Sequence, residues 1–357
     1  MKPNALPNVS RRELLRAGVV AVGAAWALAA GPGDETSEAA PDPEQVPQAT
    51  HAFIRRCARD DGGYAPSPDA AYPGNSDTGL SDLAAVTYAA VLARTMGWEL
   101  PAPTKSVEFV RRHQQKDGSF VNLGGKMDPK APMSLLHNTT QGVVALRALG
   151  SKPDVDPSPV IESFVEGDKY RKLPWYATSF FPLFYAAMDK PFPPEQEKAL
   201  ARHMAENQKE DGYIQDHVAA TFHMAHFFRL VGKPTPKAEA MVRRTVRDQK
   251  EDGGWNFKAP DWDVHACFDA LFILRQLGDD APDVRRAIEK GGRWALSCRN
   301  PDGGFGHYPG RHADMDAVYF NFGAAIQAGL VPGARTDSPD AHTLGWGHAM
   351  QPGKIYR

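Results

Sequence analysis

The sequence predicts an all-α protein in which six helical hairpins close into a double ring around a central cavity. Three observations lead to this prediction: a turn motif that recurs along the chain, the alternation of amphipathic and apolar helical stretches, and the number of such units. The chain has 357 residues, 42% hydrophobic and 24% charged, so it can bury a large core. Its formal net charge of −2 argues against a disordered chain or a dedicated nucleic-acid-binding protein.

The first thirty residues have the pattern of an export signal. Arg11 and Arg12 precede an uncharged, Ala- and Val-rich stretch, and Ala27 and Ala29 offer a small-residue cleavage site. Paired arginines before a short apolar stretch are typical of bacterial twin-arginine signals, and such a stretch is too short to span a bilayer comfortably. We therefore expect cleavage after Ala29, a periplasmic or other extracytoplasmic location, and no membrane span.

The rest of the chain divides into a linker, one domain and a tail. Residues 31–48 are acidic and Pro-rich, and we expect them to form a disordered linker. Residues 49–330 carry the repeats and form the domain, and residues 331–357 form a C-terminal tail. Three cysteines are too few for a disulfide framework.

A turn of Asp-Gly followed by an aromatic residue recurs five times. The copies are Asp61–Tyr64, Asp117–Phe120, Asp211–Tyr213, Asp252–Trp255 and Asp302–Phe305. A degenerate copy at Glu166–Tyr170 fills the one long gap and brings the number of units to six. In such a turn the glycine permits a sharp reversal, the aspartate accepts backbone N–H groups, and the aromatic side chain can pack against a neighbouring hairpin.

Each turn separates two kinds of helical stretch. The amphipathic ones include 194–208, 236–249 and 282–298, and the almost wholly apolar ones are 80–96, 135–149, 217–231, 264–277 and 317–328. A helix with one polar side lies at a surface, whereas a helix that is apolar all round is buried. We therefore expect an outer and an inner ring of helices. An open helical solenoid is the alternative, but six units without polar end units favour closure.

The turn at Gln249–Trp255 reads Gln-x-x-Asp-Gly-Gly-Trp, and Gln114 and Gln208 precede two other turns at the same spacing. This pattern resembles the repeat of protein prenyltransferase β-subunits and of squalene and terpenoid cyclases, the prenyltransferase and squalene oxidase repeat. The resemblance covers about residues 45–330 and implies an (α/α)6 toroid with an aromatic lumen. It further implies an isoprenoid or another apolar chain as ligand, and transferase or cyclase chemistry.

Ionisable residues recur where the apolar inner stretches begin. The repeats can be aligned on the glycine that closes each inner stretch. Fifteen residues before this glycine stand Asp82, Asp263 and Asp314. Thirteen residues before it stand His137, His265 and Asp316. Helix capping accounts for Asp82 and Asp314, since aspartate accepts the free N–H groups of a helix N-terminus. Asp263, His265 and Asp316 form a denser group, which we place with Asp314 at the reactive mouth.

The resemblance to prenyltransferase β-subunits implies a degenerate zinc site. Those proteins hold zinc with an Asp-x-Cys in one repeat and a histidine that opens the next inner helix. Here the corresponding residues are Asp263, Val264 and His265, and Ala317 takes the place of the histidine. Because imidazole and carboxylate both ligate zinc, Asp263, His265 and Asp316 are candidate ligands. The sequence gives no sign of a partner subunit.

The resemblance to cyclases implies a different use of the same region. Cyclases of this superfamily protonate an alkene with the middle aspartate of Asp-x-Asp-Asp, and Asp314–Ala317 matches three of the four places. Aromatic walls would stabilise the carbocation by cation–π attraction. The candidate substrate-binding residues are Tyr88, His137, Trp175, Phe222, Phe268 and Tyr319. A third interpretation, a toroid that binds a ligand or a protein without turnover, stays open.

Overall fold

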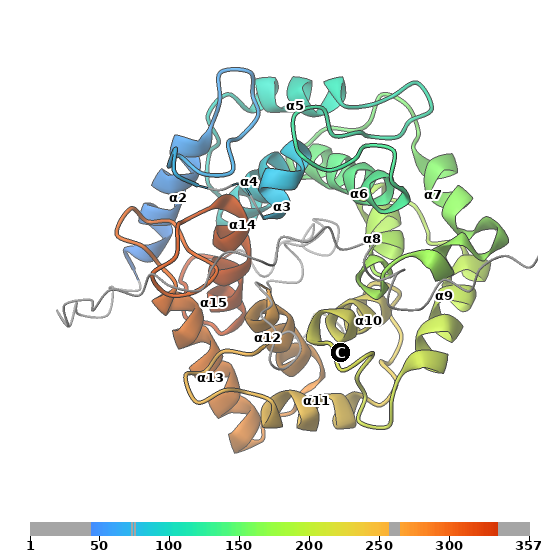
Figure 1. Cartoon of the computed structure of the whole chain (residues 1–357), viewed down its shortest axis with the longest axis vertical. Helices are drawn as coiled ribbons and strands as arrows, with labels where there is room; N and C mark the ends of the chain where they lie inside the picture. Colours follow the sequence, from blue (N-terminus) through green and yellow to red (C-terminus); the bar gives the residue numbers. More distant parts are fainter. Residues whose placement is uncertain (1–43, 73, 75, 257–264, 335–357) are drawn as a thin grey trace, which may run out of the picture. The chain divides into compact units, whose positions relative to one another are not determined.

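A computed structural model describes residues 44–334 except 73, 75 and 257–264. The contacts within the chain separate Met1–Ala40 from Pro41–Arg357, and the description below concerns the second unit. Its helices alternate between an outer and an inner ring (Figure 1). The outer helices are α2 (Val46–Cys57), α5 (Pro103–Arg112), α7 (Ser158–Val165), α9 (Pro194–Asn207), α11 (Ala238–Arg247) and α13 (Pro282–Ser297).

Six helical segments make the inner ring. They are α4 (Asp82–Met96), α6 (Pro132–Ala148), α8 (Phe180–Ala187), α10 (Val218–Leu230), α12 (Ala266–Leu277), and a last segment of α14 (Met315–Ala317), the π-helical turn η3 (Val318–Phe322) and α15 (Gly323–Gln327). Each packs against the next, and the last segment packs against α4. The inner ring is therefore closed, and the chain forms the predicted (α/α)6 toroid.

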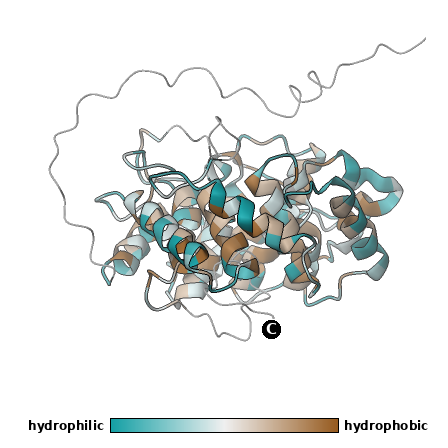
Figure 2. Cartoon of the chain, turned by 90° about the horizontal axis from the view of Figure 1, so that it is seen from below, coloured by the Kyte–Doolittle hydropathy of each residue, from teal (hydrophilic) through white to brown (hydrophobic). Residues whose placement is uncertain are grey.

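Burial follows the predicted division between the two rings. Almost every side chain of the inner helices is buried, whereas the outer helices bury one face only. Outer helices accordingly show both hydrophilic and hydrophobic segments in the side view (Figure 2). Within the described residues, no helix has the length and apolar character needed to cross a membrane, and Cys57, Cys267 and Cys298 are buried and free.

The five regular Asp-Gly turns each pack against the backbone of the following unit. In the first turn Gly62 has a φ of +90°, and a Cβ atom there would lie 2.2 Å from the carbonyl oxygen of Lys105 in α5. In the last turn Gly303 has a φ of +88°, and a Cβ atom would lie 2.3 Å from the carbonyl oxygen of Ala49 in α2. Only glycine fits so close an approach at positive φ. The sixth unit thus contacts the first as the first contacts the second, which closes the outer ring.

The other turn residues act as predicted. Each turn aspartate accepts the backbone N–H two residues later, as Asp252 does from Gly254 at 3.0 Å. The glutamine before the turn reaches into the next unit: Gln249 donates to the carbonyl oxygens of Gly253 and Ala287, both at 2.9 Å. This second bond explains why a glutamine precedes the motif.

The third unit departs from the repeat, as its degenerate sequence predicts. Gly167 and Asp168 both adopt left-handed conformations, with φ of 61° and 57°, inside the 3-10 segment η1 (Glu166–Lys172). A second 3-10 segment, η2 (Trp175–Ala177), leads into α8, the short inner helix of this unit. In the first unit a single helical turn, α3 (Asp77–Leu80), precedes α4. Helix α2 begins at Val46, three positions before the expected start of the domain at residue 49.

Candidate functional site

The last inner segment carries two buried carboxylates at its N-terminal end. Asp314 Oδ1 accepts the backbone N–H groups of Asp316 at 2.9 Å and Ala317 at 3.0 Å, so Asp314 caps α14 as predicted. The cap fixes Asp316 in the first helical turn, where its side chain is 0% exposed. The π-helical turn η3 follows directly, and such turns occur frequently at functional sites.

Two imidazoles contact these carboxylates. His265 is the residue directly before α12, and its Nε2 atom lies 3.0 Å from Asp316 Oδ2. His307 lies in the loop between the turn of the sixth unit (Asp302–Phe305) and α14. Its Nε2 atom lies 3.1 Å from Asp314 Oδ2 and 3.4 Å from Asp316 Oδ2. We call these four residues the His–Asp cluster.

The carboxylates determine the charge of His307. Burial alone would disfavour its imidazolium form, but the negative charge of the nearby Asp314 carboxylate outweighs it. The pKa of His307 is therefore raised above its ordinary value. The cluster can thus hold a positive charge within a buried site that also contains two carboxyl groups.

Aromatic side chains surround the cluster. The Phe320 ring stacks on His265 with ring centroids 3.6 Å apart, and it meets Phe268 edge-on at 5.2 Å. Phe320 also lies 5.9 Å from Tyr88, which stacks on Tyr319 at 4.2 Å. Side chains from η3, α12 and α4 therefore form a group of aromatic rings that contacts the His–Asp cluster through the His265 ring.

These contacts continue around the ring. Phe268 meets Phe222 of α10 at 5.8 Å, and Phe222 meets its neighbour His223 at 4.9 Å. Phe180 of α8 lies 5.8 Å from His223 and 5.8 Å from His137 of α6. We call this chain of rings, from Tyr88 to His137, the aromatic belt. All six inner segments contribute to it.

A family model supports this architecture. Residues 28–138 and 175–352, well over half of the chain, match the prenyltransferase alpha-alpha toroid domain. The chain belongs to this family. No curated protein sequence matches the chain.

Solved structures of the same fold include enzymes of two kinds. The type II terpene cyclase MstE from Scytonema is 15% identical with a TM-score of 0.53, and the match covers 82% of this chain and 100% of that one. A variant of MstE in complex with geranylgeranyl dihydroxybenzoate is 14% identical with a TM-score of 0.53, over 86% of this chain and 97% of that one. The Candida albicans protein geranylgeranyltransferase-I complexed with GGPP is 12% identical with a TM-score of 0.56, and the match covers 79% of this chain and 91% of that one. At these identities the likeness concerns the fold.

The toroid brings most of the predicted site residues together. His265, Asp314 and Asp316 meet in the His–Asp cluster, and the belt contains Tyr88, His137, Phe222, Phe268 and Tyr319. Asp263 lies outside the described residues. Trp175, expected on the lumen wall, stacks instead on His203 of the outer helix α9, with centroids 4.4 Å apart. His307 is an addition to the predicted site: it lies in a loop, outside the register of the inner-helix heads on which the prediction rests.

The expected cap at Asp82 is wrong. Ser81 occupies the N-cap position of α4, and in the described part of the chain no side chain caps that helix. Asp82 Oδ2 instead accepts the backbone N–H of Gly124 at 2.8 Å and contacts Nε2 of the buried His113 at 2.9 Å. This carboxylate therefore joins the inner helix to the end of α5 and to the loop that follows the second turn.

Three residues of the His–Asp cluster fit a metal ion. His265, His307 and Asp316 each offer one ligand atom, and these atoms all lie within 4.8 Å of one another. Two imidazole nitrogens and one carboxylate oxygen suit zinc, and three protein ligands leave a position open for a substrate or water. His307 thus joins two of the predicted ligands, His265 and Asp316.

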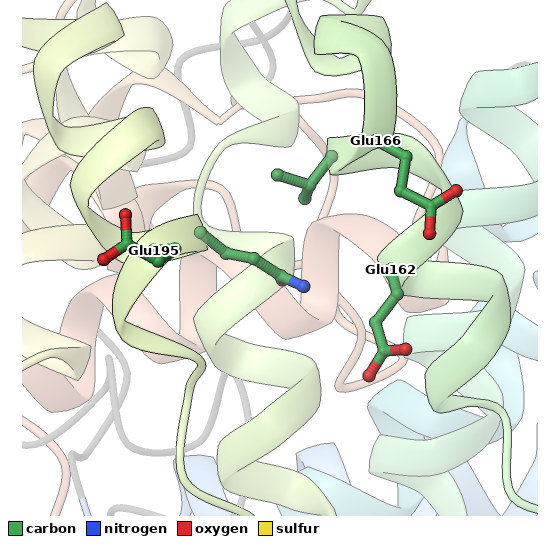
Figure 3. A pocket seen from close by; sticks show the side chains of 5 residues that line it. Glu162, Glu166 and Glu195 are labelled. Atoms are coloured by element: carbon green, nitrogen blue, oxygen red, sulfur yellow. The ribbon is translucent and has the colours of Figure 1, made fainter.

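A pocket on the outer ring offers less chemistry. It lies between α7 and α9, and its lining residues are Glu162, Val165, Glu166, Glu195 and Gln196. The three carboxylates sit apart around the pocket rather than converging on one point (Figure 3). We therefore place the candidate functional site at the His–Asp cluster.

Proposed function

We propose that this toroid binds an isoprenoid chain inside its inner ring and starts a cationic cyclisation by protonating it with Asp316. The position of Asp316 carries the proposal: it is fully buried at the head of the last inner segment and contacts two imidazoles beside the aromatic belt. A terpene cyclase and a GGPP-bound geranylgeranyltransferase share the fold, which supports isoprenoids as the ligand class.

Asp316 is better suited than Asp314 to carry the acid proton. Asp314 caps α14 with one oxygen and contacts His307 with the other. An apolar site with a second carboxyl group nearby helps a carboxylic acid to keep its proton. The proton of Asp316 passes to an alkene carbon, where a C–H bond forms and the neighbouring carbon becomes cationic. His265 and His307 then stabilise the carboxylate left on Asp316.

The aromatic belt supplies what the cation needs. Ring faces attract a positive charge, and an apolar surrounding keeps water away from it. Phe320 and Tyr88 lie next to the cluster, and Phe268 continues the wall. Ring closure moves the positive charge along the isoprenoid, and a neighbouring carbon then gives a proton to water, which restores an alkene. Asp316 regains its proton from solvent before the next turnover.

A second candidate function, metal-assisted prenyl transfer, is favoured by the ligand atoms of His265, His307 and Asp316. A zinc ion bound there would act as a Lewis acid or lower the pKa of an acceptor group.

Metal analysis and turnover distinguish the two functions. For cyclisation we expect the protein to convert squalene or geranylgeraniol after treatment with a chelator. Asp316→Asn should lower the rate at least about a hundredfold, while Glu195→Gln, in the outer pocket, should leave it unchanged. Stoichiometric zinc that is lost in His307→Ala would favour prenyl transfer instead. Retained apolar ligand without turnover or metal would favour a binding protein and reject both enzymes.

We also propose that the protein is exported by the twin-arginine route. The support is the sequence of residues 1–30, which lie outside the described residues.

A further inference from the structure

The inner ring holds a second set of buried polar groups, on α6. His137 and Gln141 are one helical turn apart and only 5% and 2% exposed. Gln141 Nε2 lies 3.3 Å from His137 Nε2. His137 Nδ1 and Gln141 Oε1 have no hydrogen-bond partner among the described residues.

The bond between these two residues leaves one donor and one acceptor unused. When the Gln141 amide donates to His137 Nε2, the imidazole proton is on Nδ1, so Nδ1–H is an unused donor and Oε1 an unused acceptor. If the amide is turned over, the donor and the acceptor exchange places. In both cases the pair is complementary to a group that donates and accepts at once. Buried polar groups without partners are costly and rare, so a ligand group there would be stabilised.

His137 is placed like the residues of the His–Asp cluster. It stands thirteen residues before the glycine that closes its inner helix, as His265 and Asp316 do in theirs. Its ring ends the aromatic belt through Phe180. Helix α6 lies across the ring from α12 (Figure 1). A ligand that lies along the belt therefore has the His–Asp cluster at one end and His137 at the other.

We infer that His137 and Gln141 form a subsite for an uncharged hydrogen-bonding head group, such as a hydroxyl or amide, of the isoprenoid ligand. This inference rests on the proposed function, because it assumes an isoprenoid along the belt. Burial lowers the pKa of the His137 imidazole below its ordinary value, so the ring is neutral near neutral pH. A neutral imidazole and an amide suit a hydroxyl better than a diphosphate.

Binding of geranylgeraniol and of the hydrocarbon of equal chain length to the full-length protein tests the inference, with quenching of tryptophan fluorescence as the readout. The wild-type protein should bind the alcohol roughly tenfold more tightly. His137→Phe keeps an aromatic ring beside Phe180, and Gln141→Met keeps the side-chain length. Each should weaken binding of the alcohol roughly tenfold and leave binding of the hydrocarbon unchanged.

Thr140→Val is the matched control. It removes a buried hydroxyl from the same helix. Among the described residues this hydroxyl donates to the Leu136 carbonyl alone, so the preference for the alcohol should persist. Equal binding of alcohol and hydrocarbon by the wild-type protein would overturn the inference but leave the proposed function intact. Two other results would have the same meaning: tighter binding of geranylgeranyl diphosphate than of the alcohol, or an equal loss of affinity for alcohol and hydrocarbon in the variants. If neither ligand binds the wild-type protein, the proposed function fails as well.

Discussion

The Nε2 atom of His307 lies 3.1 Å from Oδ2 of Asp314, while Oδ1 of the same carboxylate caps α14. One side chain therefore holds the loop after the sixth turn against the helix that carries Asp316. The catalytic candidate is positioned by a neighbour that has a structural role of its own.

Two substitutions of Asp314 separate its role as the cap of α14 from its contact with His307. Asp314→Ala removes the cap and leaves the buried His307 without its nearest carboxylate, so the free energy of unfolding should fall by about 1–2 kcal/mol. Asp314→Asn keeps an oxygen that can accept the helix N–H groups, so it should cost less. Urea unfolding of both variants measures the difference. Equal losses would show that the cap does not stabilise α14.

The close contact of each turn with the next outer helix can be tested at Gly253. Its φ is +100°, and a Cβ atom would lie 2.6 Å from the carbonyl oxygen of Lys290 in α13. Gly310 provides the control, since its φ is +74° but a Cβ atom would meet nothing within 4 Å. Gly310→Ala should cost about 1 kcal/mol, from its left-handed conformation alone, and Gly253→Ala at least about 3 kcal/mol. Similar melting temperatures for the two variants would contradict the packing described for the turns.

Stability in acid should depend on Asp216. Its hydrogen bonds to Lys209 and Arg244 lower the pKa of its carboxyl group to about 2. Because the folded pKa lies below the unfolded one, the stabilisation is present above the unfolded pKa of about 4 and is lost as the pH falls towards the folded value. Asp216 is 43% exposed, so solvent limits the effect to under about 1 kcal/mol.

Asp216→Asn measures this contribution. The difference in unfolding free energy between the wild-type protein and the variant should be largest near neutral pH at low salt. It should shrink in acid, where the wild-type carboxyl group becomes neutral too. A difference that stays constant down to pH of about 2 would show that the ion pairs contribute nothing.

The export signal makes a prediction about the mature protein. In a bacterial host with a twin-arginine pathway, the exported chain should begin at Ala30, as N-terminal sequencing of the periplasmic fraction would show. Replacing Arg11 and Arg12 together by lysine should keep the precursor in the cytoplasm, because the paired arginines are read by the export receptor. Arg16→Lys is the control and should be exported normally. Periplasmic protein from the double variant would reject this signal.

The sequence predicts the fold because its repeats constrain the backbone. An Asp-Gly turn followed by an aromatic residue recurs in every regular unit. The closing glycines set one register for the inner helices. That register is why the sequence alone groups His137, His265 and Asp316. It also places Phe222 and Phe268 on inner helices that meet.

The remaining site residues depend on loops and on distant contacts. His307 lies in a loop, where helical periodicity gives no register. Trp175 lies in the third unit, which lacks the regular turn needed for alignment. Asp82 follows the register, but its partners His113 and Gly124 come from other segments and decide its role. Local sequence carries no information about such partners.

The contact between Gly303 and Ala49 means that the toroid has no terminal repeat from which unfolding could start. A linear stack of hairpins can fray from either end, whereas a ring must first break an interface between two neighbours. Cutting the chain in a surface loop of another unit and linking the present ends, as in a circular permutant, should therefore preserve the fold. The order of the six units along the gene would then matter less than their order around the circle.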